Sequence, residues 1–264
     1  MSKPCTKKLA HTPRLYADRE LEDQWRFYQT PYRRDDSDAA TAVSIDCEMG
    51  VNDYGESELI RVSVIDYFSG AVLLDKLVWP DVKMSHWNTR FSGVTARDMQ
   101  EARRRRACLF GRAAARRAIW AFVSPETIVV GHAVHGDLAS LRWIHHRVVD
   151  TLIIEDDVVR REKARREREE AEREQREREE QGETAEEGEA AGGDAAEEDE
   201  QQQQQQQQQN KPKEPSPPMG LKALAKERLD RTIQIKGRGH DSVEDALATR
   251  DLLHWHITNR FKVN

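Results

Sequence analysis

The sequence predicts an α/β domain built on a mixed β-sheet, and three observations support this class. Three strand-like runs follow one another between residues 41 and 79. Helical and strand-like runs then alternate from about residue 95 to residue 154, as expected when helical crossovers connect the strands of a mixed sheet. Residues 155–218 are too polar to bury a core, so we expect them to interrupt the domain as a long disordered or helical insertion.

The opening strands are expected at 41–49, 58–67 and 71–79, where apolar and β-branched residues predominate. The pair Ser69-Gly70 favours a tight turn, so the second and third strands should form an antiparallel hairpin. Residues 1–38 mix proline, charged and aromatic residues without a clear period. They are expected to form an N-terminal arm, either packed on the domain or partly disordered.

The second half of the domain should alternate helices and strands. A helix rich in Ala and Arg is expected over 95–122, and a short strand over 127–130. Leu138, Leu141 and Ile144, at three-residue steps, favour a helix over 137–147, and a fifth strand should follow over 148–154. After the insertion, helices are expected over 220–230 and 242–261, so the folded domain comprises 39–154 and 219–264.

Composition restricts the class of protein. The 264 residues are 37% hydrophobic and 34% charged, with a net charge of −6. Residues 160–200 alone carry −9, so the rest carries about +3, and a nucleic-acid partner is not excluded. The three cysteines form no C-x-x-C pair, which indicates neither a disulfide framework nor a thiolate zinc site. Without a membrane-length apolar run or a secretory signal, the chain is expected to be soluble and intracellular, with no membrane partner.

Three short clusters hold the residues that could carry chemistry. Asp46 and Glu48 are two apart in a strand and therefore project from one face, where like charges cost free energy unless a cation neutralises them. Asp137 begins a predicted helix just after a strand, and Asp245 lies one turn inside the last helix. His240 precedes that helix on a lead-in segment, from which a histidine can reach an attacking water, a position that suits a general base.

Each cluster also has a simpler interpretation. A lone D-x-E pair is commoner on the polar face of an edge strand than in a metal site. Asp137 is a favoured residue for the start of a helix, and Ser242 with Asp245 resembles a capping box. His132 and His135 are more often packed or hydrogen-bonded than ligating, because hard cations that handle phosphates prefer oxygen donors.

Four strings of the sequence together resemble the motifs of the DEDDh 3′→5′ exonucleases. The C-E-M after the first Asp and the G-H-A-x-H before the second resemble the RNA exonuclease branch, of the Rex and interferon-stimulated type. The strings occupy 44–49, 130–138, 220–225 and 240–246, and the resemblance covers about 41–154 and 219–260. The chain departs from the family at Gly50-Val51, where V-G is usual, and at Gly136, where Asn is usual.

The resemblance implies a ribonuclease H-like fold, a five-stranded mixed sheet with helices on both faces. It implies a hydrolase that is a metal-dependent 3′→5′ exoribonuclease acting in RNA processing, releasing 5′ nucleoside monophosphates from single-stranded 3′ ends. The implied roles are two Mg²⁺ or Mn²⁺ ions on four carboxylates, a histidine base and a methionine that contacts the substrate. The corresponding residues are Asp46, Glu48, Asp137 and Asp245, then His240, then Met49.

Several alternatives stay open at this stage. The same chemistry could act on DNA, because the choice of sugar depends on contacts to the 2′-OH. A non-catalytic adaptor could instead use the Arg/Glu segment and the glutamines of 201–209 to bind protein partners. Arginines 103–106, with Arg112, Arg116 and Arg117, could either contact phosphates or form a solvated face. The family and the basic residues of 160–166 favour a nuclear or nucleolar location, and the cytoplasm otherwise.

Overall fold

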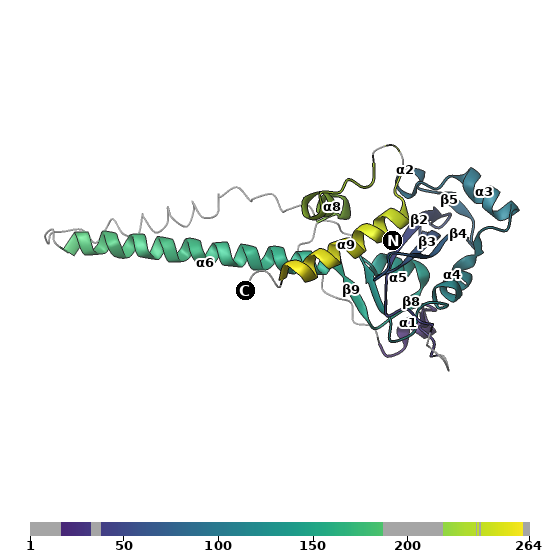
Figure 1. Ribbon diagram of the computed structural model, residues 1–264, viewed down its shortest axis with the longest axis horizontal. Helices are drawn as coiled ribbons and strands as arrows, with labels where there is room; N and C mark the ends of the chain where they lie inside the picture. Colours follow the sequence, from purple (N-terminus) through teal and green to yellow (C-terminus); the bar gives the residue numbers. More distant parts are fainter. Residues whose placement is uncertain (1–16, 33–37, 187–218, 236, 238, 261–264) are drawn as a thin grey trace. The chain divides into compact units, whose positions relative to one another are not determined.

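The computed structural model describes residues 17–32, 38–186, 219–235, 237 and 239–260. The chain forms two compact units (Figure 1), of which the first comprises Met1–Thr151 and Leu224–Asn264 and the second Leu152–Ala223. None of the helices in the described part of the chain is long and apolar enough to cross a membrane.

A mixed sheet forms the centre of the first unit. Its five central strands are β2 (Ala42–Asn52), β3 (Ser57–Asp66), β4 (Val72–Trp79), β7 (Ile128–Gly131) and β9 (Val148–Asp150). Their order is β4-β3-β2-β7-β9, antiparallel on the β4-β3-β2 side and parallel from β2 to β9. The expected five-stranded mixed sheet is confirmed, and two short strands, β5 (Met84–His86) and β6 (Leu109–Phe110), extend it.

The alternate residues of β2 face two different layers. One face contributes to the main core the residues Val43, Ile45 and Cys47. On the other face, the Ser44 hydroxyl donates to the Ala246 carbonyl of α9 (Ser242–Arg260) over 2.8 Å. Because Asp46 and Glu48 follow Ser44 at two-residue steps, they lie on the face that α9 covers.

The single helix expected over 95–122 is wrong, because the chain forms two helices there. A capping box between Thr95 and Asp98 starts α3 (Ala96–Arg104). After α3 the backbone turns at Arg106, whose φ of 55° is left-handed, and β6 pairs with β4 before α4 (Gly111–Ile119) begins. The arginine-rich run therefore contains a reversal that its helix propensity did not indicate.

The helix expected over 137–147 is shorter than predicted. It is α5 (His135–Leu141), and it ends where Arg142 adopts a left-handed conformation. The next two residues form β8 (Trp143–Ile144), which pairs with β1 (Tyr28–Gln29) of the N-terminal arm. The arm also contains α1 (Glu20–Asp23). Its described part is therefore packed on the domain through β1, whereas residues 1–16 and 33–37 lie outside the described part.

The strand expected over 148–154 ends at Asp150, and α6 (Thr151–Glu186) follows at once. The Asp150 carboxylate accepts the N–H groups of Ala133 and Val134 over 2.9 and 3.0 Å, so it serves the turn before α5. The start predicted for the insertion, residue 155, thus lies inside a helix.

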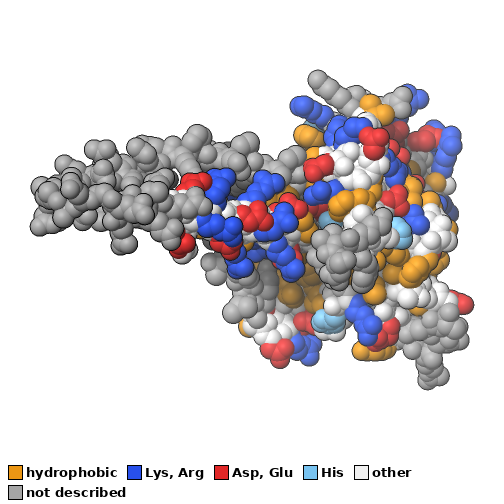
Figure 2. Space-filling view, turned by 60° about the vertical axis from the view of Figure 1, so that its left-hand side comes forward, with side chains coloured by type: hydrophobic (Ala, Val, Ile, Leu, Met, Phe, Trp, Pro, Cys, Tyr) orange, Lys and Arg blue, Asp and Glu red, His pale blue; other side chains and the backbone are white. Residues whose placement is uncertain are grey.

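The expected Arg/Glu helix is present in α6. Basic and acidic side chains lie side by side (Figure 2) and pair at i,i+4 spacing, as Lys163–Glu167, Arg165–Glu169 and Arg173–Glu177. Such exposed pairs support a helix without burying a core. The glutamine run 201–209 lies outside the described residues. Beyond it, α8 (Leu221–Leu229) and α9 match the two expected closing helices closely.

Candidate active site

Asp46 and Glu48 lie in the part of β2 that extends beyond its parallel neighbour β7. The last β2–β7 pair is Ser44 with Val130. Farther along, the Cys47 N–H has no strand partner on that side and donates to Asp137 Oδ1 over 2.8 Å. The carboxylate of Asp137 is thereby attached to the backbone between Asp46 and Glu48. This contact accounts for the place of Asp137 better than a simple helix cap does.

The capping box proposed for the last helix is wrong. The Ser242 hydroxyl bonds to the Ser63 hydroxyl of β3 over 2.7 Å, and Asp241 Oδ1 accepts the Val243 N–H over 3.1 Å. Asp241 therefore caps α9, and the carboxylate of Asp245 is available for another role. The two serine contacts of α9, through Ser44 and Ser63, fix the start of this helix over β2 and β3.

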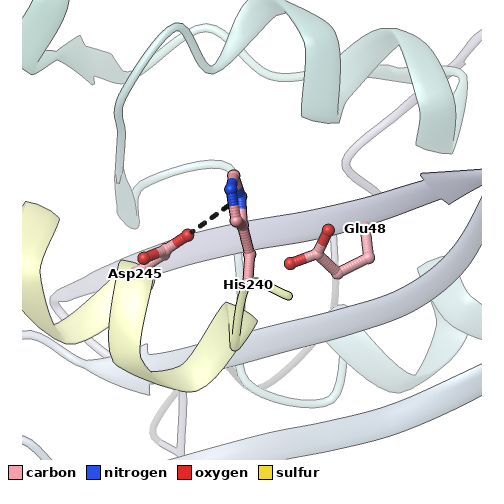
Figure 3. A group of neighbouring side chains, drawn as sticks. All are labelled: Glu48, His240 and Asp245. Atoms are coloured by element: carbon pink, nitrogen blue, oxygen red, sulfur yellow. Dashed lines mark ion pairs between the residues drawn. The ribbon is translucent and has the colours of Figure 1, made fainter. Parts of the chain in front are cut away.

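Three predicted site residues meet beneath the start of α9. Glu48, His240 and Asp245 each offer a ligand atom, and these atoms lie within 4.8 Å of one another. Figure 3 shows the three side chains converging, with His240 Nδ1 3.7 Å from Asp245 Oδ2. Glu48 and Asp245 are buried, whereas 36% of the His240 side chain is exposed. The imidazole is thus reachable from solvent while the carboxylates are not.

The electrostatics bring the other two carboxylates into the same cluster. Burial, then the charges of Asp137, Asp245 and Glu48, raises the pKa of Asp46 well above its usual range. Burial also raises the pKa of Glu48 to about 8 and that of Asp137 to about 7. The pKa of Asp245 rises too, mainly through burial. The ionisation of Asp46 and Glu48 is thus opposed by the charges of Asp137 and Asp245, which relates the four carboxyl groups to one another.

These residues fit divalent cations. Among the described residues, Glu48 Oε1 and Asp245 Oδ1 are buried without a hydrogen-bond partner. A buried carboxylate oxygen without a partner costs free energy, which a bound cation would offset. The donor set is dominated by carboxylate oxygens, the ligands that Mg²⁺ and Mn²⁺ prefer.

Sequence reasoning missed two residues that act on the cluster, one through a hydrogen bond and one through its charge. Gln234 Nε2 donates to Asp245 Oδ2 over 2.9 Å, and so orients one ligand candidate. Arg61 is the register partner of Glu48 on β3, and its charge lowers the pKa of both Asp46 and Glu48. Arg61 sits two residues before Ser63 on an alternating strand, a weak signal that its side chain shares the site's face.

One of the two departures from the family pattern has a structural explanation. A Cβ atom on Gly50 would lie 2.8 Å from the His86 carbonyl oxygen, so the approach of β5 requires glycine there. A Cβ on Gly136 would meet open space, so the small residue is not required by packing. Met49 lies half-buried at a β-bulge directly after Glu48, and its contact with substrate stays a prediction.

Two of the arginines considered for phosphate binding are used inside the domain. Arg112 pairs with the buried Glu58 over 2.7 Å, and the buried Arg116 donates to the Leu141 carbonyl over 2.6 Å. Arg104 and Arg105 both pair with Glu101 and are mostly exposed. The phosphate-binding interpretation is therefore wrong for Arg112 and Arg116.

Comparisons with known proteins agree with this geometry. No family model matches the chain. RNA exonuclease 3 of Emericella nidulans is 28% identical over 96% of this chain and 34% of that protein, and RNA exonuclease 3 of Yarrowia lipolytica is 30% identical over 82% and 21%. The human RNA exonuclease 1 homolog is 37% identical over 42% of this chain and 8% of its own length. The chain thus spans between 8% and 34% of the length of these relatives.

The solved structures show the same fold. The Neurospora crassa Pan2 catalytic unit, a protease and nuclease domain, matches 87% of this chain and 29% of its own, with a TM-score of 0.54 and 18% identity. The Saccharomyces cerevisiae Pan2 pseudoubiquitin hydrolase and RNA exonuclease module with A7 RNA matches 88% and 31%, with a TM-score of 0.52 and 16% identity. The expected resemblance is confirmed: the chain is similar in sequence to the RNA exonucleases, and its ribonuclease H-like fold is that of the DEDDh group.

Proposed function

We propose that this chain is a metal-dependent 3′→5′ exoribonuclease. The observation that carries the proposal is the convergence of Glu48, His240 and Asp245, in which two buried carboxylate oxygens have no hydrogen-bond partner among the described residues. Asp137 accepts the Cys47 N–H, which lies between Asp46 and Glu48, so the other two carboxylates belong to the same stretch of β2. Asp46, Glu48, Asp137 and Asp245 would hold two Mg²⁺ or Mn²⁺ ions. Two ions in such a site would lower the pKa of a bound water, so that it can be deprotonated and attack at neutral pH, and they would stabilise the leaving oxygen.

The protein's own residues supply the remaining chemistry. His240 lies at the solvent side of the cluster and would accept the proton of the attacking water. Water would add to the terminal phosphodiester while the bond to the 3′ oxygen of the preceding nucleotide breaks. The products are a 5′ nucleoside monophosphate and a chain shortened by one nucleotide. Asp245 would stabilise the protonated imidazole, because its Oδ2 lies 3.7 Å from His240 Nδ1.

RNA is the favoured substrate. The relatives similar in sequence are named RNA exonucleases, and the Pan2 modules of the same fold have been solved with RNA. A 3′→5′ enzyme needs a free single-stranded 3′ end, and we expect Met49, which follows Glu48 in β2, to contact its last nucleotide. DNA is the competing substrate of the same chemistry.

A non-catalytic adaptor is less well supported. Placing four carboxylates together, three of them buried, destabilises a fold that uses its site only as a scaffold. Protein partners for residues 155–218 are compatible with an active enzyme, since the exposed charges of α6 are separate residues from the site. A nuclear or nucleolar location is part of the same proposal.

The test is nucleotide release from 3′-labelled single-stranded RNA and DNA, with Mg²⁺, with Mn²⁺ and with chelator. We expect mononucleotide release from RNA that chelator abolishes. Faster release from DNA would overturn the choice of substrate. No release from either polymer would favour the adaptor, and Asp46→Asn provides the inactive control for any contaminating nuclease.

A further inference from the structure

We propose that α2 (Thr89–Ser92) is a positioning element for His240, which it holds by backbone contacts while being anchored to the strand that carries Glu48. This inference rests on the proposed function, in which His240 is the general base. The element touches neither the carboxylates nor the reacting atoms in the described contacts. It would set where the imidazole stands relative to them.

The first contact is between backbones. The His240 N–H donates to the Phe91 carbonyl over 2.5 Å, and the two rings meet edge to face with centroids 6.4 Å apart. A backbone hydrogen bond at the histidine itself fixes the Cα from which the imidazole projects. This hydrogen bond uses neither ring nitrogen of His240, so the contact with α2 does not compete with proton transfer.

The second contact is a close approach of two glycines. Gly239 has a φ of +74°, and a Cβ on it would lie 2.4 Å from Gly93 Cα and 2.5 Å from Gly93 N. Gly93 is itself left-handed, with a φ of 67°, and ends α2. Neither backbone could approach so closely with a side chain at position 239. The pair lets the residue before His240 lie directly against the end of α2.

The third contact attaches α2 to the metal-site strand. Asn88, which precedes α2, donates through Nδ2 to the Met49 carbonyl over 3.2 Å. Its backbone N–H also bonds to the His86 ring on β5, and β5 pairs with β2 at Val51. One short element therefore contacts both the residue after Glu48 and the residue before His240. The short helix α2 therefore connects the segment of His240 to the segment of Glu48.

The consequence is kinetic rather than structural. A reacting group displaced by about 1 Å can lose roughly 10²-fold in rate, even though binding is unchanged. Loosening α2 should therefore lower kcat and leave KM and metal affinity nearly as they were. Damage to the fold would instead affect all three together.

The test is Gly239→Ala, with Gly55→Ala as the matched control. Gly55 also has a positive φ, +79°, but a Cβ there meets nothing within 4 Å. We expect kcat to fall roughly 10–100-fold in Gly239→Ala, with KM within about threefold and Mn²⁺ affinity unchanged. Gly55→Ala should lose the same backbone freedom yet keep wild-type kcat. Equal kcat in the two variants would overturn the proposal that α2 positions His240.

A second comparison shows whether the effect passes through His240. In a His240→Ala background, Gly239→Ala should cause no further loss of kcat, because there is no base left to misplace. An additive loss would overturn the inference. If Gly239→Ala does not fold, Asn88→Gly replaces it, since glycine keeps the left-handed φ of 50° and removes the contact to Met49. Failure of the proposed function is distinguishable, because wild type would then release no nucleotide.

Discussion

Burial and the charges of three neighbouring carboxylates raise the pKa of Asp46 well above its usual range, so its ionised form is unfavourable in the metal-free protein. Asp46→Asn should abolish nucleotide release, since a carbonyl oxygen without charge is a poor ligand for a hard cation. The same change should raise the melting temperature of the metal-free protein at pH 8, where it removes a repelling charge. Activity assays and thermal unfolding in chelator provide the measurement.

The matched control for this change is Asp53→Asn, at an aspartate that pairs with Lys83 at the surface. It should leave both activity and melting temperature near their wild-type values. Near wild-type activity of Asp46→Asn in excess Mg²⁺ would contradict the metal site. Parallel losses of stability and activity would mean that Asp46 serves the fold.

The position of His240 is compatible with a base and with a metal ligand, because a ring nitrogen lies within 4.8 Å of carboxylate oxygens of Glu48 and Asp245. As a base, His240→Ala should lower the rate by roughly 10²–10⁴-fold and keep metal affinity close to wild type. Raising the pH should partly rescue this variant, because hydroxide from the solvent is then available as the nucleophile and no base is needed to deprotonate water. Mn²⁺ titration of both proteins makes the distinction, and a large loss of affinity would assign His240 as a ligand.

At the scale of elements, α6 continues through the boundary that composition suggested. Glu155 is fully buried, whereas the side chains from residue 160 to residue 179 are exposed. A deletion should therefore begin after Val159 rather than after Ile154. Joining Val159 to Met219 through a short Gly/Ser linker should keep most turnover, because loop-closure cost changes by only about 0.6 kcal/mol per doubling of length.

Turnover on a short RNA and circular dichroism provide the measurement for this deletion. The companion deletion that begins after Ile154 removes Glu155 and should be less stable. If the longer form is also inactive while folded, residues 160–218 contribute to catalysis and the domain map is wrong.

At the scale of the molecule, the carboxylate cluster links stability to pH and metal. The folded-state pKa values of Glu48 and Asp137, about 8 and about 7, exceed their ordinary values of 4.5 and 3.8. The folded protein thus binds more protons than the unfolded chain between these limits, so its free energy of unfolding falls as pH rises from about 4.5 to about 8. Added Mg²⁺ or Mn²⁺ should reverse the loss.

Thermal unfolding at pH 5.5 and pH 8, with chelator and with Mn²⁺, tests this linkage. We expect the metal-free protein to melt at least about 2–4 °C lower at pH 8, the shift that about 1 kcal/mol produces at this size. In Asp46→Asn the pH dependence should be weaker. A metal-free melting temperature that rises with pH would contradict the assigned pKa directions.

The sequence predicted the sheet well, because strand patterns are local, and three of its candidate site residues, Glu48, His240 and Asp245, lie close together in the structure. Asp46 and Glu48 are two residues apart in a strand, and this spacing alone predicts that their side chains share a face. Tertiary contacts decided the rest. Arg142 ends α5 early because Trp143 pairs with the N-terminal arm, and Asp150 ends β9 because its carboxylate serves the turn at Ala133. The Phe91 carbonyl is a backbone group, so no pattern of residue types could have marked it.

The docking of α9 on β2 and β3 through Ser44 and Ser63 has a consequence for the nascent chain. Asp46, Glu48 and Asp137 precede residues 155–218, whereas His240 and Asp245 follow them. A growing or truncated chain that stops within residues 155–218 contains the central strands, yet it carries neither the proposed base nor the fourth carboxylate. If the chain is the nuclease proposed above, hydrolysis would therefore begin only after synthesis has passed residues 155–218 and α9 has docked on β2 and β3.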